Sequence, residues 1–250
     1  MNLKKNVTSY GRFKTAPWFD GISQSRIMIL GAGGIGSWLS LFLARTGANL
    51  IIVDMDTVED HNLGGQLYGN NSIGKSKVNA VSEIITELCG ENNITPINEE
   101  VTLNDTDQWF QYMQHCDVLC TSFDSIAARK IAYQQWVKYG KEDSLFIDGR
   151  MSMQQGQVFT VQKNASQEDF MHYEDTFFDD NDIPQAPCTA KATSHCGALI
   201  ASLMTSQITN LFTNKNPESM PAIVENQINF CLPVSLFETV KVKNYDTVTQ

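Results

Sequence analysis

The chain has 250 residues, of which 42% are hydrophobic, so it can bury the core of one large α/β domain. Its formal net charge of −10 argues against a nucleic-acid partner, because such partners are held by basic side chains. The acidic balance is equally compatible with a basic partner surface and with a charge that merely keeps the protein in solution.

We expect no membrane span and no signal peptide, because the chain has no run of about 18 apolar residues and its N-terminus lacks an apolar segment. A cytoplasmic location is the corresponding expectation. The six cysteines are scattered and form no C-x-x-C pair, which predicts reduced thiols and no four-cysteine zinc site.

The strongest motif is a glycine-rich turn after the first predicted strand. Residues 27–30 are apolar, which is typical of a strand buried on both faces. Gly31, Gly33 and Gly36 then match the spacing G-x-G-x-x-G. Glycine at these positions allows a tight turn, a close approach of the backbone to a phosphate, and packing of a helix on a strand.

The elements after this turn complete a nucleotide-binding pattern. A helix is predicted over residues 37–45 and a second buried strand over residues 50–53. Asp54 follows that strand, at the position where an acidic residue commonly binds ribose hydroxyls. The whole unit predicts a nucleotide site more strongly than the glycine spacing alone.

Strands and helices then alternate along the chain, which predicts a mostly parallel sheet. Residues 55–68 are polar and glycine-rich, so we expect a long loop at the carboxyl end of the second strand, where ligands bind in open α/β sheets. The next predicted elements are a helix from Lys77 to Gly90, an edge strand over 94–98, a helix over 105–114, a strand over 117–121, a helix over 126–137 and a strand over 145–148.

The pattern changes beyond Gly149. The predicted elements there are an antiparallel strand over 157–161, an apolar helix over 194–212, and closing strands over 228–232 and 235–240. Residues 164–187 are acidic and aromatic in large part, and we interpret residues 164–193 as a crossover loop that acts as a lid or a partner-facing surface. The predicted fold is Rossmann-like α/β with antiparallel C-terminal strands, organised as an N-terminal arm (1–20) and a single domain (21–250).

Three features favour nucleoside triphosphate chemistry over redox chemistry. The loop after Asp54 offers the amide groups of Asn62 and Gln66 to ribose and phosphate oxygens. Lys77 places a cation at a helix start, where free backbone N–H groups attract phosphate. Asp124 follows a parallel strand, and its carboxylate would be costly beside a triphosphate unless it held Mg²⁺.

In these motifs the chain resembles the ubiquitin-activating superfamily, including its bacterial ThiF/MoeB-type adenylyltransferases. The resemblance covers residues 10–160 well and the helix that begins at Ser194 more loosely. The matching runs are residues 31–36, 54–59, 62–63, 66, 74–77 and 120–124.

The resemblance implies ATP- and Mg²⁺-dependent adenylation of the C-terminal carboxylate of a ubiquitin-like protein or peptide, with release of pyrophosphate and with or without transfer to a cysteine. It implies that Lys77 stabilises transition-state charge, that Asp124 positions Mg²⁺, and that the neighbour in a homodimer lends Arg12 from its arm. Ser125 and Arg129 are expected to face the nucleotide, although Arg129 could instead form only a surface ion pair. The other residues implied in nucleotide binding are Gly31, Gly33, Gly34, Gly36, Asp54, Asp56, Asn62 and Gln66.

The chain departs from the family at Gly65, where the family usually has an arginine that grips the phosphates. This change removes a permanently charged, bidentate donor. Either another cation replaces it or catalysis is weakened or lost. The candidates are Arg12, Lys75, Arg129 and Arg150. The paired C-x-x-C motifs of many bacterial members are also absent, so we expect no zinc.

Cys188 is a candidate nucleophile. A Cys-Thr pair in a similar place carries the thioester-forming thiol in the ubiquitin-activating branch, and Lys191 and His195 would activate Cys188 if they lowered its pKa. The alternative is an ordinary loop cysteine. Cys196 is a second candidate, because it lies at a predicted helix start, where thiolates are favoured.

Three other functions compete with adenylation of a protein carboxylate. An NAD-dependent oxidoreductase is favoured only by the glycine spacing and Asp54. A catalytically impaired relative that binds a nucleotide or a partner without turnover is favoured by Gly65. A relative that acts on a tRNA-borne carboxylate is disfavoured by the acidic charge.

Overall fold

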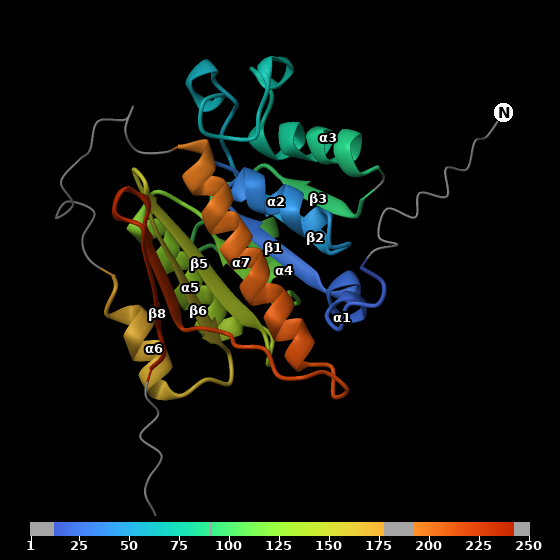
Figure 1. The fold of residues 1–250 in the computed structure, drawn as a ribbon. Coiled ribbons are helices and arrows are strands. Elements are labelled where there is room, and N and C mark those ends of the chain that lie inside the picture. The colour runs from blue at the N-terminus through green and yellow to red at the C-terminus, as the bar shows by residue number, and fades with distance from the viewer. Residues whose placement is uncertain (1–12, 91, 178–192, 243–250) are drawn as a thin grey trace, which may run out of the picture.

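The computed structural model describes residues 13–90, 92–177 and 193–242, which form one eight-stranded sheet covered by helices (Figure 1). The strand order is β3-β2-β1-β4-β5-β6-β7-β8. The first five strands in this order run parallel, and the remaining ones are antiparallel. The predicted fold class is therefore confirmed.

Where the parallel strands pair with one another they are short and mostly apolar, as expected for strands covered on both faces. They are β1 (Arg26–Leu30), β2 (Asn49–Val53), β3 (Ile94–Ile97), β4 (Val118–Thr121) and β5 (Leu145–Ser152). β3 lies at the edge of the sheet, as its proline predicts, because Pro96 has no N–H to donate to a further strand.

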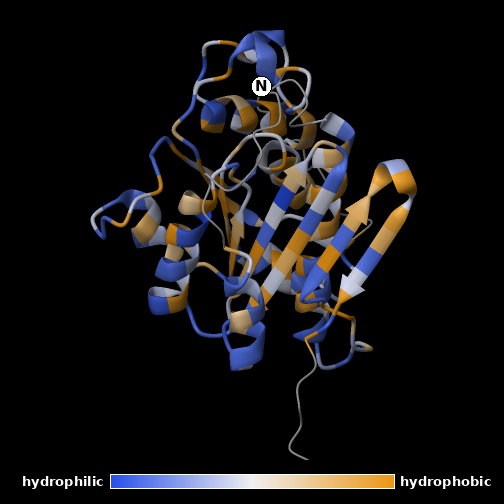
Figure 2. Cartoon of the chain, turned by 90° about the vertical axis from the view of Figure 1, so that its left-hand side faces the viewer, coloured by the Kyte–Doolittle hydropathy of each residue, from blue (hydrophilic) through white to orange (hydrophobic). Residues whose placement is uncertain are grey.

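The antiparallel half consists of β6 (Gln155–Gln162), β7 (Gln227–Cys231) and β8 (Leu236–Val240). β8 forms the other edge of the sheet and carries hydrophobic residues, visible on the outer hairpin in Figure 2. Leu236 and Phe237 of this strand are 48% and 56% exposed.

Helices cover both faces of the sheet. The helices are α1 (Phe19–Gln24), α2 (Gly36–Ala44), α3 (Lys77–Cys89), α4 (Gln108–Met113), α5 (Ile126–Tyr139), α6 (Gln167–Glu174) and α7 (Ser194–Asn214). Alternate residues of β1 enter two separate cores: Ile27 and Ile29 pack with α2, α3 and α7, whereas Met28 and Leu30 pack with α4, α5 and α6. The sheet is thus the middle layer of a three-layer structure.

The loop prediction over residues 164–193 is wrong for residues 167–174, which form α6. Ser166 caps this helix in a capping box with Asp169, and acidic residues in a first helical turn are favoured by the helix dipole. Tyr173 is 1% exposed, and with Phe170 and Phe177 it packs against the α5 side of the core. The three aromatic residues of this stretch that the structure describes therefore build core rather than lid, and Cys188 lies outside the described residues.

Helix α7 packs against the glycine-rich turn through Gly197. A Cβ atom added at Gly197 would lie 2.1 Å from the carbonyl oxygen of Gly34. A side chain at this position would push α7 away from the turn, because backbone atoms cannot yield as a flexible side chain does. Gly197 therefore sets the distance between α7 and the glycine-rich turn.

We predict that Gly197→Ala destabilises the protein by about 1–3 kcal/mol through overpacking, or roughly 2–12 °C in Tm for a chain of this size. Thermal unfolding measures the effect. Gly69→Ala is the matched control, because a Cβ at Gly69 meets nothing within 4 Å and its φ of −116° suits alanine. Equal Tm values for the two variants would contradict the packing argument.

Candidate functional site

The predicted site residues lie together at the carboxyl ends of three parallel strands. The N–H of Gly31 donates to the carbonyl of Val53 (2.8 Å), and the N–H of Ser122 donates to the carbonyl of Leu30 (3.0 Å). The glycine-rich turn, Asp54 and the loop after β4 therefore begin side by side. Gly31 has a φ of +92°, a conformation that favours glycine.

Asp54 fixes the glycine-rich turn to the end of β2. Its carboxylate accepts hydrogen bonds from the N–H groups of Ala32 (2.7 Å) and Asp56 (2.8 Å). Burial raises the pKa of Asp54 above its ordinary value, although Lys77 and the two backbone donors lower it in part. A carboxylate has acceptor sites beyond these two bonds, so Asp54 remains able to accept from ribose hydroxyls.

Lys77 is the first residue of α3 and is 8% exposed. Its Nζ lies 2.6 Å from Oδ2 of Asp56, and its N–H donates to the Asp56 carbonyl at 2.9 Å. The structure therefore holds this cation at a helix N-terminus, as the sequence predicts.

Tyr68 joins Lys77 to the glycine-rich turn and was not found by sequence reasoning. Its hydroxyl lies 2.6 Å from the carbonyl oxygen of Ala32 and 3.3 Å from that of Lys77. Burial raises the pKa of Tyr68 well above its ordinary value, so the hydroxyl keeps the proton that it donates. Only a tyrosine in a polar loop marks this role in the sequence, which is too weak a signal to predict it.

The loop between β2 and α3 places two amide side chains differently. Asn62 is buried, and its Oδ1 accepts from the N–H of Glu59 at 2.9 Å, so it stabilises the loop. Oε1 of Gln66 and Oγ of Ser76 are buried and have no hydrogen-bond partner among the described residues. Unpaired buried polar atoms are costly to a folded protein.

The loop after β4 carries Asp124, which is exposed to solvent. Oγ of Ser122 lies 2.8 Å from the carbonyl oxygen of Gly31, which ties this loop to the glycine-rich turn. Ser125 caps α5 by accepting from the N–H of Ala128 at 3.3 Å. Asp124 therefore lies beyond the end of β4, between Ser122 and Ser125, which are both fixed by hydrogen bonds.

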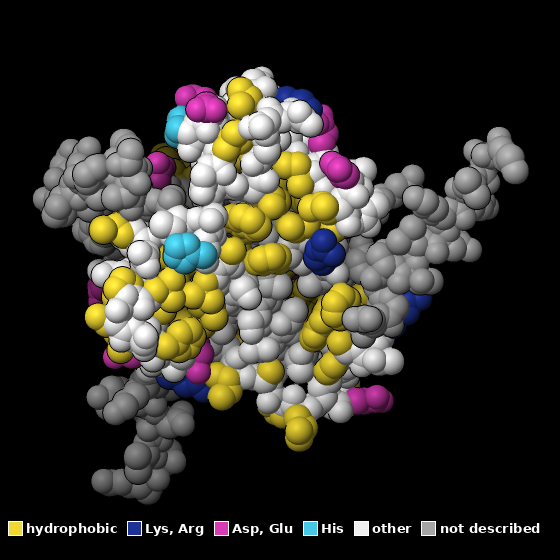
Figure 3. Space-filling model, turned by 45° about the horizontal axis from the view of Figure 1, so that its top comes forward, with side chains coloured by type: hydrophobic (Ala, Val, Ile, Leu, Met, Phe, Trp, Pro, Cys, Tyr) yellow, Lys and Arg dark blue, Asp and Glu magenta, His cyan; other side chains and the backbone are white. Residues whose placement is uncertain are grey.

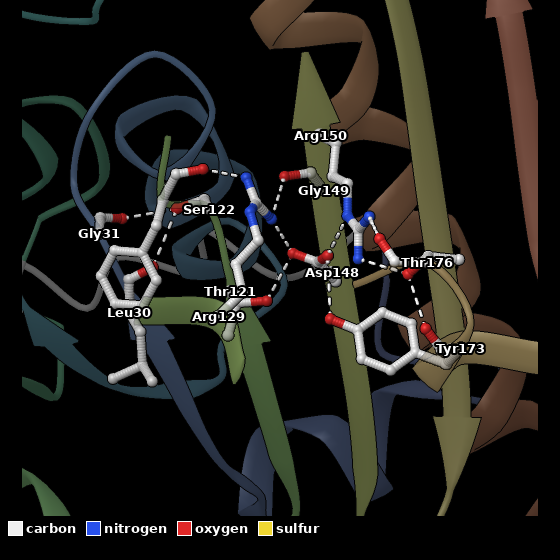
Figure 4. Close-up of polar contacts among 11 residues, drawn as sticks. Leu30, Gly31, Thr121, Ser122, Arg129, Asp148, Gly149, Arg150, Tyr173 and Thr176 are labelled. Carbon is white, nitrogen blue, oxygen red and sulfur yellow. Dashed lines mark hydrogen bonds and ion pairs between the residues drawn. The ribbon is translucent and has the colours of Figure 1, made fainter. Parts of the chain in front are cut away.

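Arg129 lies inside the protein, with 3% of its surface exposed. Its guanidinium donates to the Asp148 carboxylate, to the Gly149 carbonyl and to the Phe123 carbonyl (Figure 4). Arg129 therefore forms a buried ion pair with Asp148, not the surface ion pair that was one of the two expectations. Its contact with a nucleotide stays a prediction.

Asp148 is the centre of a buried polar cluster that sequence reasoning missed. It accepts from Oγ1 of Thr121 (2.6 Å), Nε of Arg150 (2.7 Å) and the Tyr173 hydroxyl (3.0 Å), besides Arg129. Burial alone would raise the pKa of Asp148, but the two guanidinium groups and the donated hydrogen bonds outweigh it, so the pKa lies below its ordinary value. The only sequence signal was an acidic residue directly after the apolar run 145–147.

Four residues are candidates for the cation that would replace the family arginine at Gly65. Three of them lie in the described part of the chain, and each is ion-paired: Lys75 with Glu83, and Arg129 and Arg150 with Asp148. Arg12 lies outside the described residues. The Gly65 carbonyl accepts from Nε1 of Trp38 at 3.3 Å.

Cys196 is not an activated thiol, contrary to the sequence interpretation. It is fully buried, and burial raises its pKa to about 11 although it lies in the first turn of α7. Desolvation therefore outweighs the helix dipole here. Among the described residues no group of three His, Cys, Asp or Glu side chains could hold a metal ion, and no helix is long and apolar enough to cross a membrane.

The fold and the site define a Rossmann-like α/β protein with a buried lysine beside its glycine-rich turn. Comparison with known families matches residues 12–248 to the ThiF family, and the chain belongs to that family.

Two relatives and one solved structure illustrate the similarity. The chain is 30% identical over 165 residues to the adenylyltransferase and sulfurtransferase MOCS3 of Dictyostelium discoideum, covering 62% of this chain and 37% of the relative. It is 32% identical over 114 residues to SUMO-activating enzyme subunit 2 of the same organism, covering 45% and 17%. The chain thus spans less than half of the length of these curated relatives. The fold is similar to that of Escherichia coli MccB in its crystal structure with ATP, with a TM-score of 0.72, 16% identity, and coverage of 99% and 75%.

We predict that Asp148→Asn destabilises the protein by about 3–5 kcal/mol at neutral pH, because it leaves two buried guanidinium groups without their counter-charge. Since the native pKa of Asp148 is lowered, its ionised form stabilises the fold above the ordinary value of 3.8, and this contribution is lost as the pH falls through the native value. Denaturant unfolding at several pH values measures both effects.

Asp117→Asn is the control for this prediction. Asp117 pairs with Lys141, whose side chain is 50% exposed, and asparagine keeps an oxygen that can accept from the N–H of Arg26 (2.9 Å), so the replacement should cost at most about 1 kcal/mol. A cost for Asp148→Asn no larger than that of Asp117→Asn, or an unchanged acid dependence, would contradict the role given to Asp148.

Proposed function

We propose that this protein binds ATP with Mg²⁺ and adenylates the C-terminal carboxylate of a small ubiquitin-like protein or peptide, with release of pyrophosphate. The observation that carries the proposal is Lys77, a buried cation at the start of α3. It is held by Asp56 and linked through Tyr68 to the glycine-rich turn. A dinucleotide site requires the glycine-rich turn and Asp54 but gives no reason for this lysine.

The charges at the carboxyl ends of these strands favour the binding of ATP together with a divalent cation. Of the site residues that the structure describes, Asp54, Asp56 and Asp124 contribute three carboxyl groups and Lys77 contributes one ammonium group. Figure 3 brings this end of the molecule forward and shows lysine and arginine side chains that are scattered rather than gathered. A triphosphate therefore needs a metal ion to offset repulsion, and the exposed carboxylate of Asp124 is a hard oxygen ligand of the kind that Mg²⁺ prefers.

Each residue has a defined task in this proposal. Lys77 stabilises the negative charge that develops on the phosphates, and Asp56 orients its ammonium group. Gln66 and Ser76 offer an amide group and a hydroxyl group to ribose and phosphate oxygens. Mg²⁺, when bound by Asp124, neutralises phosphate charge.

Adenylation would activate the partner for a second step. The acyl-adenylate has AMP as its leaving group, which departs far more readily than hydroxide, so a thiol or an amine can attack the carbonyl carbon. We propose Cys188 as the first thiol to test and Arg12 of a homodimer neighbour as the missing cation. Loss of a thiol-reducible conjugate in Cys188→Ser and loss of activity in Arg12→Ala would support these assignments.

A second candidate function is nucleotide or partner binding without turnover. It is favoured by Gly65 together with the ion pairing of Lys75, Arg129 and Arg150, which leaves no unpaired replacement among the described candidates. Such a protein would bind ATP but would not exchange pyrophosphate into it.

The test is partner-dependent exchange of labelled pyrophosphate into ATP. Candidate partners are small ubiquitin-like proteins or peptides, each also prepared with an amidated C-terminus. Exchange with the free carboxylate and none with the amide supports adenylation. Bound ATP without exchange for any partner would support the second candidate instead.

We predict that Lys77→Ala lowers the exchange rate by about 10²–10³-fold, because it removes a preorganised positive charge from the transition state. Lys75→Ala is the matched control, since Lys75 lies two residues away, is 43% exposed and pairs with Glu83. Unchanged exchange in Lys77→Ala, or an equal loss in Lys75→Ala, would contradict the assignment of Lys77.

A further inference from the structure

The Asp148 carboxylate has no acceptor site left for a substrate. Thr121 and Arg129 donate to Oδ1, and Arg150 and Tyr173 donate to Oδ2. These four bonds fill the acceptor capacity of a carboxylate. Asp148 is also fully buried, so any effect that it has on a reaction must pass through the residues it holds.

One of those residues reaches the loop that carries the proposed metal ligand. The guanidinium of Arg129 bridges Asp148 and the carbonyl of Phe123, the residue directly before Asp124 (Figure 4). On the other side of this loop, Ser122 is tied to the glycine-rich turn at 2.8 Å. The backbone just before Asp124 is therefore held from two directions, once by Arg129 and once by the turn.

The second arm of the cluster holds α6. Nη2 of Arg150 donates to Oγ1 of Thr176 at 2.8 Å, and its Nη1 donates to the Thr176 carbonyl at 3.2 Å. The guanidinium also lies over the ring of Phe159, 4.5 Å from its centroid. One carboxylate thus fixes both the loop before α5 and the turn that follows α6.

Stability alone is a poor explanation for this cluster. Removing charges from water is costly, and apolar side chains of similar volume often stabilise a core as well as a buried ion pair does. A buried ion pair does fix the geometry, because a planar guanidinium donates good hydrogen bonds only to partners in a narrow range of positions.

We propose that Asp148 and Arg129 are positioning residues for Asp124. Asp148 holds the guanidinium of Arg129, Arg129 holds the Phe123 carbonyl, and Asp124 is thereby kept where it binds the Mg²⁺ that accompanies ATP. This inference rests on the proposed function and adds to it a second layer of residues that sets the metal affinity. Residues that orient a metal ligand typically change metal affinity or activity by about 10–100-fold when they are replaced.

The test is the Mg²⁺ concentration that gives half-maximal stabilisation by saturating ATP, measured by thermal shift. We expect Asp148→Asn and Arg129→Lys each to raise this concentration by about 10–100-fold. Arg129→Lys keeps the buried positive charge and so serves if Asp148→Asn does not fold. Hydrogen exchange should also become faster in a peptide covering residues 119–126 in both variants.

Ile208→Ala is the control for lost stability, because Ile208 is fully buried in α7 and belongs to the core on the other face of the sheet. Its Mg²⁺ half-maximum should equal that of the wild type. Folded Asp148→Asn and Arg129→Lys proteins with a wild-type Mg²⁺ half-maximum would overturn this inference alone. A wild-type protein without Mg²⁺-dependent ATP binding would overturn the proposed function and this inference together.

Discussion

The site depends on the parallel register of β1, β2 and β4. Leu30 pairs with both Val53 and Thr121, so the three strands end at the same level. Their loops then find hydrogen-bond partners in one another rather than in water, as in the bond from the Ala32 N–H to the Asp54 carboxylate. Segments far apart in the sequence thereby begin side by side at the carboxyl ends of these strands.

Around the carboxyl ends of these strands, Lys77 and Asp148 are buried, and each is paired with an opposite charge. Lys77 is held by Asp56, while Asp148 is shared between Arg129 and Arg150. Buried ions are tolerated only where partners and hydrogen bonds replace water, so these pairs fix the directions of their side chains. The first pair leaves a cation beside the glycine-rich turn, and the second anchors the loop that presents a carboxylate. The arrangement suits a highly charged ligand that brings its own metal ion.

Local patterns in the sequence were sufficient to predict the strands, most of the helices, the glycine-rich turn and the place of Lys77, because these follow from periodicity and helix-start chemistry. Helix α6 was missed, since it is only eight residues long and lies in an acidic run typical of loops. The links made by Tyr68 and Asp148 join residues far apart in the chain, and only the tertiary fold shows them. Cys196 was misjudged because its burial, which decides its pKa, is also a tertiary property.

The most direct test of the central claim, an ATP site that works with Mg²⁺, is thermal stability measured with ATP and Mg²⁺, ATP alone, AMP and NAD at equal concentrations. A ligand at about a hundred times its Kd stabilises the native state by about 2.7 kcal/mol, which is roughly 5–11 °C for a chain of this size. The account predicts a shift with ATP that depends on Mg²⁺ and no shift with NAD. A shift with NAD alone, or no shift with any of these ligands, would contradict it.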